Sequence, residues 1–456
     1  MLRLLRGFLA LLLGAWIAAP AGAFTPLGPF EAWQIASIGY RLGGDIGGPL
    51  NLGEEYRWNI RTVTYGYDES FLNYFGAEGV AAIEQAVGIL NALPPVSQMS
   101  TNLDEFPLES RRLNFQASAL NLLDLKSAAL SLMIEEMGLA DPERWTWCLR
   151  SRNTFPGFTN YTVIKRNFDP VTLAPSSYVN GTLYTYFITD QQNPQIADAQ
   201  ENLVDPLFPF GTAVASSGFG FGQFYIGLSR DDVGGLRYLW RTNNYNTENL
   251  VTGTILTPVL VTNPPPLGSP VGTPPTIITN IAVSQALRPG VDKITFVRAA
   301  YDSLLGTFIP QTNTYIDSYV TNSMIVTQAV RRIITGAPEI LFAAADVGVV
   351  LGVPVLGTRN TAAAPNWINN DNINGRSALA GPGVIQAPGP NSASVTITFN
   401  KVGPWRINQN PFFLDELNFV SLGFVWGSFD GSTNPPVVYP IGTSIYDLEN
   451  QVLNPP

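Results

Sequence analysis

The sequence predicts an α+β protein in which a mixed helix and sheet part precedes a β-rich, sandwich-like part. Three observations lead to this fold class. Apolar residues at helical three- and four-residue spacing occur mainly before residue 258. Short β-branched and aromatic runs, separated by Pro, Gly and Asn, dominate after residue 276. The stretch between them, 259–275, is rich in proline and typical of an extended linker. We therefore expect an α+β domain over 24–258 and a β-rich domain over 276–456.

Residues 1–23 have the pattern of a secretory signal peptide. Arg3 and Arg6 precede an apolar core that is too short to span a bilayer comfortably. Ala21-Gly22-Ala23 is a small-residue cleavage site, so we expect cleavage before Phe24. An uncleaved anchor is the alternative. We expect a secreted protein, or one at the exterior of the cell envelope, with no transmembrane segment after signal cleavage.

The composition argues against several functions. Charged residues make up only 13% of the chain and hydrophobic residues 45%, which favours a folded protein. The net charge is −10 and no basic stripe is present, so nucleic acid is not an expected partner. The chain has no histidine, which removes Ser-His-Asp and Cys-His catalysis and the usual zinc and copper ligand sets. Its single cysteine, Cys148, cannot form an internal disulfide.

The first half contains three predicted helices. Tyr56–Tyr67 alternates apolar and polar residues and predicts a strand, and Ala77–Leu93 follows it as the first helix. The second helix is predicted over Leu125–Pro142, with Asp124 as its N-cap and Gly138 as a left-handed C-cap.

Two adjacent carboxylates lie near the end of that second helix. The helix dipole disfavours anions there by about 0.3–1 kcal/mol each. Glu135 and Glu136 therefore either mark a functional site or lie on a solvated face, and the solvated face is the simpler interpretation.

Strands and a third helix follow. Tyr161–Arg166 and Tyr178–Thr189 are strand candidates, and Asn180-Gly181 in the second run can close a tight turn. Leu228–Trp240 predicts a short helix that begins with a Ser229–Asp232 capping box. Asp231 and Asp232 both fall in its first turn, where the helix dipole favours anions, and capping accounts for both.

Beyond the proline-rich linker the pattern is mostly β. One helical piece, Ser323–Ile334, is expected to interrupt the strands. Asn370–Gly375 (NDNING) has amides where a calcium loop needs acids, so an Asn/Gly turn is the simpler interpretation. We expect no metal site and no cofactor. The strand candidates of this half are Ile277–Val283, Val291–Val297, Tyr315–Val320, Ser394–Asn400 and Phe419–Trp426.

Three segments, in order, resemble the matrixin metalloproteases of the metzincin group. They are the strand and helix that include Thr62–Tyr65 and Ile89–Asn91, the segment Asp124–Pro142, and the segment Leu228–Trp240. The second is similar to the family's zinc helix, which leads into H-E-x-x-H. The third is similar to the family's closing helix and is the most specific match. An independent α+β fold that shares these short motifs is the alternative.

Position by position, the resemblance places the first zinc histidine at Ser131, the catalytic glutamate at Leu132 and the second histidine at Glu135. No counterpart of the third histidine exists, because the chain has none. Zinc hydrolysis needs imidazole ligands and a carboxylate base beside an open coordination position. The resemblance therefore implies a protease-like fold without protease chemistry, and we lean against an enzyme.

Three functions remain open. The first is an exported non-catalytic protein with a structural, adhesive or assembly role, which self-associates through sheet edges or binds an extracellular partner. The second is a carboxylate-based glycoside hydrolase that uses two of Glu135, Glu136, Asp231 and Asp232, with Trp145 and Trp147 lining a sugar groove. The third is a carbohydrate- or protein-binding module. Two carboxylates converging in a pocket would favour the enzyme.

Overall fold

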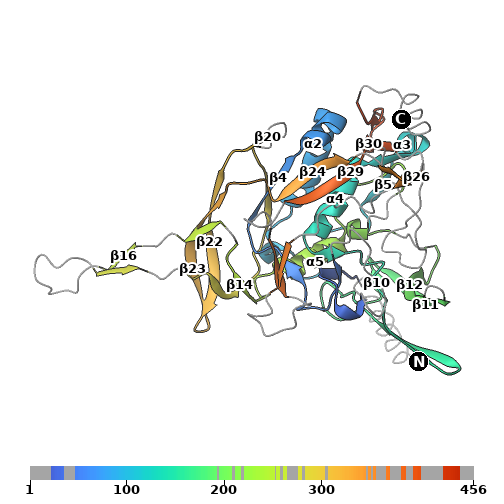
Figure 1. The fold of residues 1–456 in the computed structure, drawn as a ribbon, viewed down its shortest axis with the longest axis horizontal. Coiled ribbons are helices and arrows are strands. Elements are labelled where there is room, and N and C mark those ends of the chain that lie inside the picture. Colours follow the sequence, from blue (N-terminus) through green and yellow to red (C-terminus); the bar gives the residue numbers. More distant parts are fainter. Residues whose placement is uncertain are drawn as a thin grey trace, which may run out of the picture.

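The fold was analysed in a computed structural model (Figure 1). The structure describes residues 22–34, 47–192, 195–207, 211–216, 220–251, 253–256, 260–263, 276–279, 283–302, 307–345, 348–350, 353–355, 366–369, 382–386, 394–401 and 425–441. The predicted signal peptide up to residue 21, most of the linker and the NDNING turn lie outside these residues.

A four-stranded parallel sheet lies at the centre of the molecule (Figure 1). Its order is β19 (Thr295–Arg298), β4 (Thr62–Tyr67), β24 (Ile340–Ala345) and β29 (Val395–Asn400). All three pairings are parallel, with Phe296 beside Val63 in the first. Strand β4 comes from the N-terminal half and its three partners from the C-terminal half. Parallel strands need crossover connections, so distant parts of the chain must meet here.

Two helices pack against this sheet and each other. Helix α2 (Glu69–Asn91) places Phe71 and Phe75 against Phe342 of β24 and Phe399 of β29, with ring centroids 6.0–6.3 Å apart. The chain bends within α2 at Gly76, whose φ of 60° favours glycine. Helix α4 (Leu125–Glu136) packs beside α2, and the hydrophobic core continues through both. Among the described residues, no helix has the length and apolar character to cross a membrane.

Local capping signals predict three helix termini correctly. Asp124 caps α4 by accepting the Ser127 amide, and Gly138 has a φ of 108° just after its end. Helix α5 (Arg230–Trp240) begins with the predicted capping box of Ser229 and Asp232. The described residues also include α3 (Phe115–Ala119) and the 3₁₀ turns η2 (Val96–Gln98) and η3 (Val214–Ser216).

A five-stranded antiparallel sheet, which we call the projecting sheet, extends from the body at the left of Figure 1. Its order is β14 (Asn246–Asn249), β18 (Gln285–Arg288), β22 (Gln311–Thr321), β23 (Met324–Ile334) and β15 (Thr254–Leu256). The helix predicted over Ser323–Ile334 is therefore wrong. Its Ile, Val and Thr residues pair with β22 along the whole length of β23, and such side chains suit a pleated sheet.

Buried ion pairs join the projecting sheet to the body. Arg332 of β23 contacts Glu339, just before β24, at 2.5 Å. Glu339 in turn accepts the Thr64 amide of β4 at 2.5 Å. On the other side, Glu248 of β14 pairs with Arg57 of β3 (Tyr56–Arg57) at 3.0 Å. These contacts fix the sheet at its base.

The other strands form smaller sheets. Asn180 and Gly181 close the predicted turn with φ of 45° and 82°. The remaining strands are β1 (Thr25–Gly28), β2 (Gly48–Pro49) and β7 (Leu139–Ala140); β5 (Arg111–Leu113) and β13 (Gln223–Tyr225); β6 (Leu122–Asp124), β30 (Val425–Ser428) and β31 (Val437–Val438); β8 (Cys148–Phe155) and β9 (Phe158–Ile164); β10 (Tyr178–Val179), β11 (Thr182–Gln192) and β12 (Gln195–Leu203); β16 (Leu260–Asn263) and β17 (Thr276–Thr279); β20 (Tyr301–Asp302) and β21 (Thr307–Phe308); β25 (Gly348–Val350) and β26 (Val353–Val355); β27 (Asn366–Asn369) and β28 (Gly383–Gln386).

The β-rich character predicted by the sequence is confirmed, but the described strands do not form a separate C-terminal sandwich. Strands from 276–456 complete the sheet begun by β4, and one core cluster contains residues from both sides of 259–275. The proline-rich segment therefore does not divide the described core into two.

Candidate functional site

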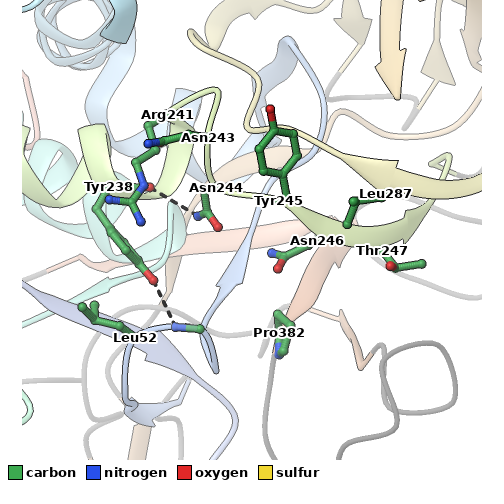
Figure 2. Close-up of a pocket in the computed structure, with 11 residues that line it drawn as sticks. Leu52, Tyr238, Arg241, Asn243, Asn244, Tyr245, Asn246, Thr247, Leu287 and Pro382 are labelled. Carbon is green, nitrogen blue, oxygen red and sulfur yellow. Dashed lines mark hydrogen bonds between the residues drawn. The ribbon is translucent and has the colours of Figure 1, made fainter. Parts of the chain in front are cut away.

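A pocket of about 590 Å³ lies at the C-terminal end of α5, between β14 and the turn that precedes β3 (Figure 2). None of the four candidate carboxylates lines it. Its lining is polar and aromatic and includes one charged residue. The lining residues are Leu52, Gly53, Tyr238, Arg241, Asn243, Asn244, Tyr245, Asn246, Thr247, Leu287 and Pro382.

The positions that carry the metzincin resemblance lie in the core instead. In α4, Ser131, Leu132 and Glu135 are 2%, 6% and 9% exposed. The helix is enclosed by α2, η3, β13 and β30, so every one of its residues is buried. In the part of the chain that the structure describes, no three His, Cys, Asp or Glu side chains are grouped so as to hold a metal ion.

Glu136 is the least compensated carboxylate of this helix. It is completely buried, and neither of its carboxyl oxygens has a hydrogen-bond partner among the described residues. Burial, and then the neighbouring charge of Glu135, raise the pKa of Glu136 well above its usual range. The solvated face expected for Glu135 and Glu136 is therefore wrong. Sequence periodicity missed this because α4 is covered on all sides, so its polar positions also face protein.

Asp232 holds a loop as well as a helix end. Its carboxylate accepts the Ser229 amide within α5 at 2.8 Å. It also accepts the amides of Val214 and Ala215 in η3, each at 3.0 Å. The prediction of a capping box is confirmed, and the structure adds a second task that no local pattern indicated. Burial raises the pKa of Asp232, whereas these hydrogen bonds oppose that shift.

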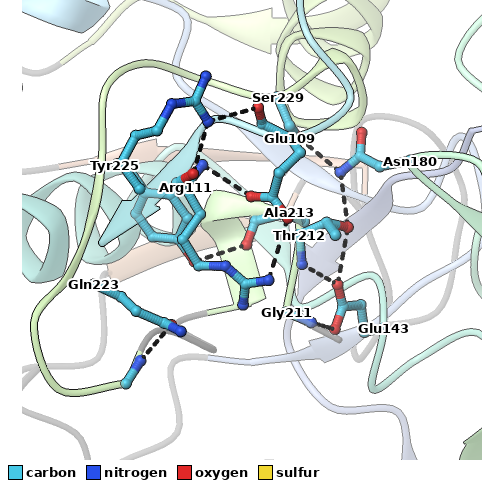
Figure 3. A network of polar contacts seen from close by, with 12 residues as sticks. Glu109, Arg111, Glu143, Asn180, Gly211, Thr212, Ala213, Gln223, Tyr225 and Ser229 are labelled. Atoms are coloured by element: carbon cyan, nitrogen blue, oxygen red, sulfur yellow. Dashed lines mark hydrogen bonds and ion pairs between the residues drawn. The ribbon is translucent and has the colours of Figure 1, made fainter. Parts of the chain in front are cut away.

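Glu143 binds the same loop as Asp232, and Figure 3 shows its contacts with Gly211 and Thr212. This buried carboxylate accepts the amides of Gly211 at 2.6 Å and Thr212 at 2.7 Å. Together Glu143 and Asp232 hold the backbone of 211–215 by four amides. Sequence analysis did not single out Glu143, because nothing local marks a carboxylate that binds a loop almost seventy residues away. Burial raises its pKa.

Asp231 binds the N-terminal segment. Its Oδ2 accepts the amide of Ala23 at 2.6 Å and that of Asn180 at 2.5 Å, and it is completely buried. Burial raises the pKa of Asp231 to about 8, although both amide hydrogen bonds oppose this shift. The predicted cleavage site before Phe24 thus adjoins a buried carboxylate in the folded chain.

The two tryptophans proposed for a sugar groove are largely covered. Trp145 is 2% exposed and lies under the Arg144 guanidinium, 4.3 Å from its ring centroid. Trp147 is half-buried against Tyr186, and the Lys165 ammonium lies over it. Of the four candidate acids, Glu135 and Glu136 lie in α4, and Asp231 and Asp232 lie in α5. Asp231 and Asp232 bind backbone amides of other segments and so organise the fold.

The projecting sheet presents a different kind of surface. Directly opposed residues of an antiparallel pair lie on the same face of a sheet. The pairings place Ile316 opposite Ala329, Ile325 opposite Val320, and Val320 opposite Leu287. We call the side that includes these residues the outer face. Its large apolar side chains are well exposed: Ile255 46%, Leu287 38%, Ile316 53% and Ile325 60%.

Comparison with known protein families, with curated proteins and with solved structures gives no significant match.

Proposed function

We propose that the protein is an exported, non-catalytic assembly protein whose copies associate through the outer face of the projecting sheet. The observation that carries this proposal is the presence of exposed isoleucine and leucine side chains on that face, interspersed with threonine and serine. Exposed apolar surface on one face of a protein typically marks an interaction site.

Charge favours a second copy of the chain as the occupant. The protein carries a net charge of −10, so most of its surface repels an identical surface. The paired outer-face positions of β22 and β23 are Thr312, Thr314, Ile316, Ser318 and Val320 with Ile325, Thr327, Ala329, Arg331 and Ile333. They include no carboxylate and a single cation. Asp317, by contrast, lies on the opposite face and pairs with Arg288. Two outer faces can therefore approach without repulsion between acids.

Backbone edges support the same contact. Within the described ranges, β23 pairs with β15 at residues 330–332 alone, and β22 pairs with β18 at Val320 alone. Among the described residues, the segment Met324–Ala329 therefore has a neighbouring strand on one side alone. Unpaired strand edges are templates for adding another strand. Self-association by strand addition, packing of outer faces, or both would use this hairpin.

The absence of catalysis rests on chemistry. The chain has no histidine. In the protease resemblance, Ser131 and Glu135 stand at two zinc-ligand positions and Leu132 stands at the position of the catalytic glutamate, and all three side chains are buried. A carboxylate-based glycoside hydrolase receives less support, because a retaining or inverting pair must flank a substrate bound between the two acids. The candidate acids do not line the described pocket.

The decisive experiment measures the mass of the mature protein by sedimentation and light scattering over a wide concentration range. We expect dimers or larger assemblies in the unmodified protein. The double variant Ile316→Asp, Ile325→Asp places two anions on the outer face and should be monomeric. Both positions are exposed, so circular dichroism should be unchanged.

Phe115→Asp is the matched control, because Phe115 is 80% exposed on α3, away from the projecting sheet. It should leave assembly intact. A sharp monomer at the highest concentration would overturn the assembly proposal, and so would an equal effect of the Phe115 variant. A casein-cleavage assay and a metal determination on the same sample should both be negative. N-terminal sequencing of exported material should begin at Phe24.

A further inference from the structure

Arg241 is an uncompensated cation in the pocket at the end of α5. Its guanidinium lies over the Tyr238 ring, 4.5 Å from the centroid (Figure 2). Its Nε is buried without a hydrogen-bond partner. Across the described residues, the Arg241 side chain has neither a hydrogen bond nor an ion pair. A guanidinium presents five N–H donors in a planar fork, and the four on its two terminal nitrogens remain available to a ligand.

A second free donor lies in the same lining. Asn246 is 7% exposed, and its Nδ2 is buried without a partner among the described residues. A buried polar group without a partner is unfavourable, and a bound acceptor relieves that cost. Asn243 and Asn244 add further amides to the lining, and Tyr245 adds an aromatic ring that is 42% exposed.

Hydrogen bonds to neighbouring residues hold the lining of the pocket in place. The buried Arg57 guanidinium donates to the carbonyl of Asn244 at 2.7 Å and pairs with Glu248 at 3.0 Å. The amide of Gly53 donates to the hydroxyl of Tyr238 at 3.0 Å, a bond visible in Figure 2. Because these neighbours are already ordered, a ligand would not have to organise them.

We propose that this pocket binds an acidic sugar, a uronic acid unit of a saccharide. The planar carboxylate matches the fork of Arg241 in a bidentate pair. Sugar hydroxyls match the amide of Asn246 and its neighbours, and the ring of Tyr245 offers an apolar face for a pyranose. No acid is among the residues that line the pocket, and the nearby Glu55 is buried behind Gly53, whose amide it accepts at 2.5 Å.

This inference goes beyond assembly and can be tested separately from it. Leu287 contributes to both the pocket and the outer face, but Arg241 and Asn246 do not belong to the outer face. If the protein does not self-associate, the Arg241 variants still decide whether the pocket binds a uronic acid.

The test uses a matched pair of probes, methyl β-D-glucuronide and methyl β-D-glucoside, which differ only at C6, where the first has a carboxylate and the second a hydroxymethyl group. Binding to the full mature protein is measured by calorimetry and by saturation-transfer NMR. We expect saturable binding of the glucuronide and at least about tenfold weaker binding of the glucoside, the range of one lost charge-assisted hydrogen bond. Arg241→Gln should weaken glucuronide binding by a similar factor.

Arg61→Gln is the control variant. It removes the same formal charge of +1 at an exposed position outside the pocket, so glucuronide binding should be unchanged. Arg241→Lys keeps the positive charge but loses the planar fork of donors, so this variant should bind the glucuronide with intermediate affinity. It replaces Arg241→Gln in the test if the glutamine variant does not fold. The proposal is overturned by unchanged binding in Arg241→Gln, by equal affinity for both glycosides, or by no glucuronide binding. Displacement by sodium sulfate at equal concentration would also overturn it, since the pocket would then be a general anion site.

Discussion

Buried carboxylates are the most unusual residues of this protein. Asp124, Glu136, Glu143, Asp231 and Asp232 are all inaccessible to solvent or nearly so, and burial raises the pKa of each. Most accept backbone amides, which offset part of the cost of removing a carboxyl group from water. Glu136 is the exception, because neither of its oxygens has such a donor among the described residues.

The substitution Glu136→Gln tests whether the buried Glu136 carboxyl group lacks hydrogen-bond donors and therefore destabilises the fold when it ionises. In the unfolded chain a glutamate ionises near pH 4.3, whereas in the folded protein the pKa of Glu136 is well above this value. Between the two pKa values the folded state binds more protons, so stability falls as pH rises. Glutamine cannot ionise and removes that loss. We expect equal stability at about pH 4 and a gain of at least about 1 kcal/mol at pH 8.

Urea denaturation of both proteins at the two pH values measures the effect. Glu78→Gln, at an exposed position of α2, is the control and should change stability little at either pH. A Glu136 variant that follows the pH profile of the unmodified protein would show that this carboxyl group is paired or hydrated in solution.

Some helices and strands of this protein are determined by residues close to them in the sequence, and others by distant residues. Helices α4 and α5 begin where capping residues lie next to them in sequence, and both start points are predicted correctly. The hairpin of β22 and β23 is determined by pairing between strands, and its second strand was predicted as a helix. Spacing of three and four residues in a short apolar run can arise by chance in a strand, and only the partner decides.

The joint between β23 and the body gives a prediction at the scale of elements. Arg332→Met removes the cation that pairs with Glu339 and leaves that carboxylate buried beside Thr64. Breaking a buried ion pair by removing one partner typically costs about 3–5 kcal/mol. We expect a loss of that size, with hydrogen exchange accelerated first in β22 and β23.

The adjacent Arg331→Met is the control. Arg331 is exposed on the outer face, so its removal should cost little stability at concentrations where the protein is monomeric. Equal losses in the two variants would indicate a general effect on the strand and not the loss of the buried pair.

At the scale of the whole molecule, the central sheet makes the two halves interdependent. Both neighbours of β4 come from beyond residue 258, and Phe342 and Phe399 cover Phe71 and Phe75 of α2. Burial of each large apolar side chain contributes about 1.5–3 kcal/mol. Because the net stability of a domain is about 5–15 kcal/mol, losing several such contacts removes an amount comparable to the whole.

A truncated chain of residues 24–258 should therefore lack a cooperative unfolding transition, whereas the full mature chain should unfold in one. Calorimetry and tryptophan fluorescence distinguish the two outcomes. A separate, reversible transition of the truncated chain would restore the two-domain arrangement predicted from the proline-rich segment.

The candidate sites also include features that could be recognised in the sequence and features that depend on contacts between distant residues. Absence of histidine and unsuitable residues at the zinc positions could be recognised in the sequence, because chemistry depends on residue type alone. The roles of Asp231 and Asp232 could not, since their partners Ala23, Val214 and Ala215 are distant or unmarked in sequence. The pocket around Arg241 was not predicted either. Its lining is drawn from four separate parts of the chain.

The sequence by itself determined the helix caps, the tight Asn180-Gly181 turn and the β-rich character, because each depends on residues close together along the chain. Only the tertiary structure decided which strands share a sheet and which carboxylates are buried. Parallel pairing and burial arise from contacts between distant segments, such as β4 with β24, and leave no local pattern to read. That is why the proline-rich stretch resembles a domain boundary while the described core continues across it.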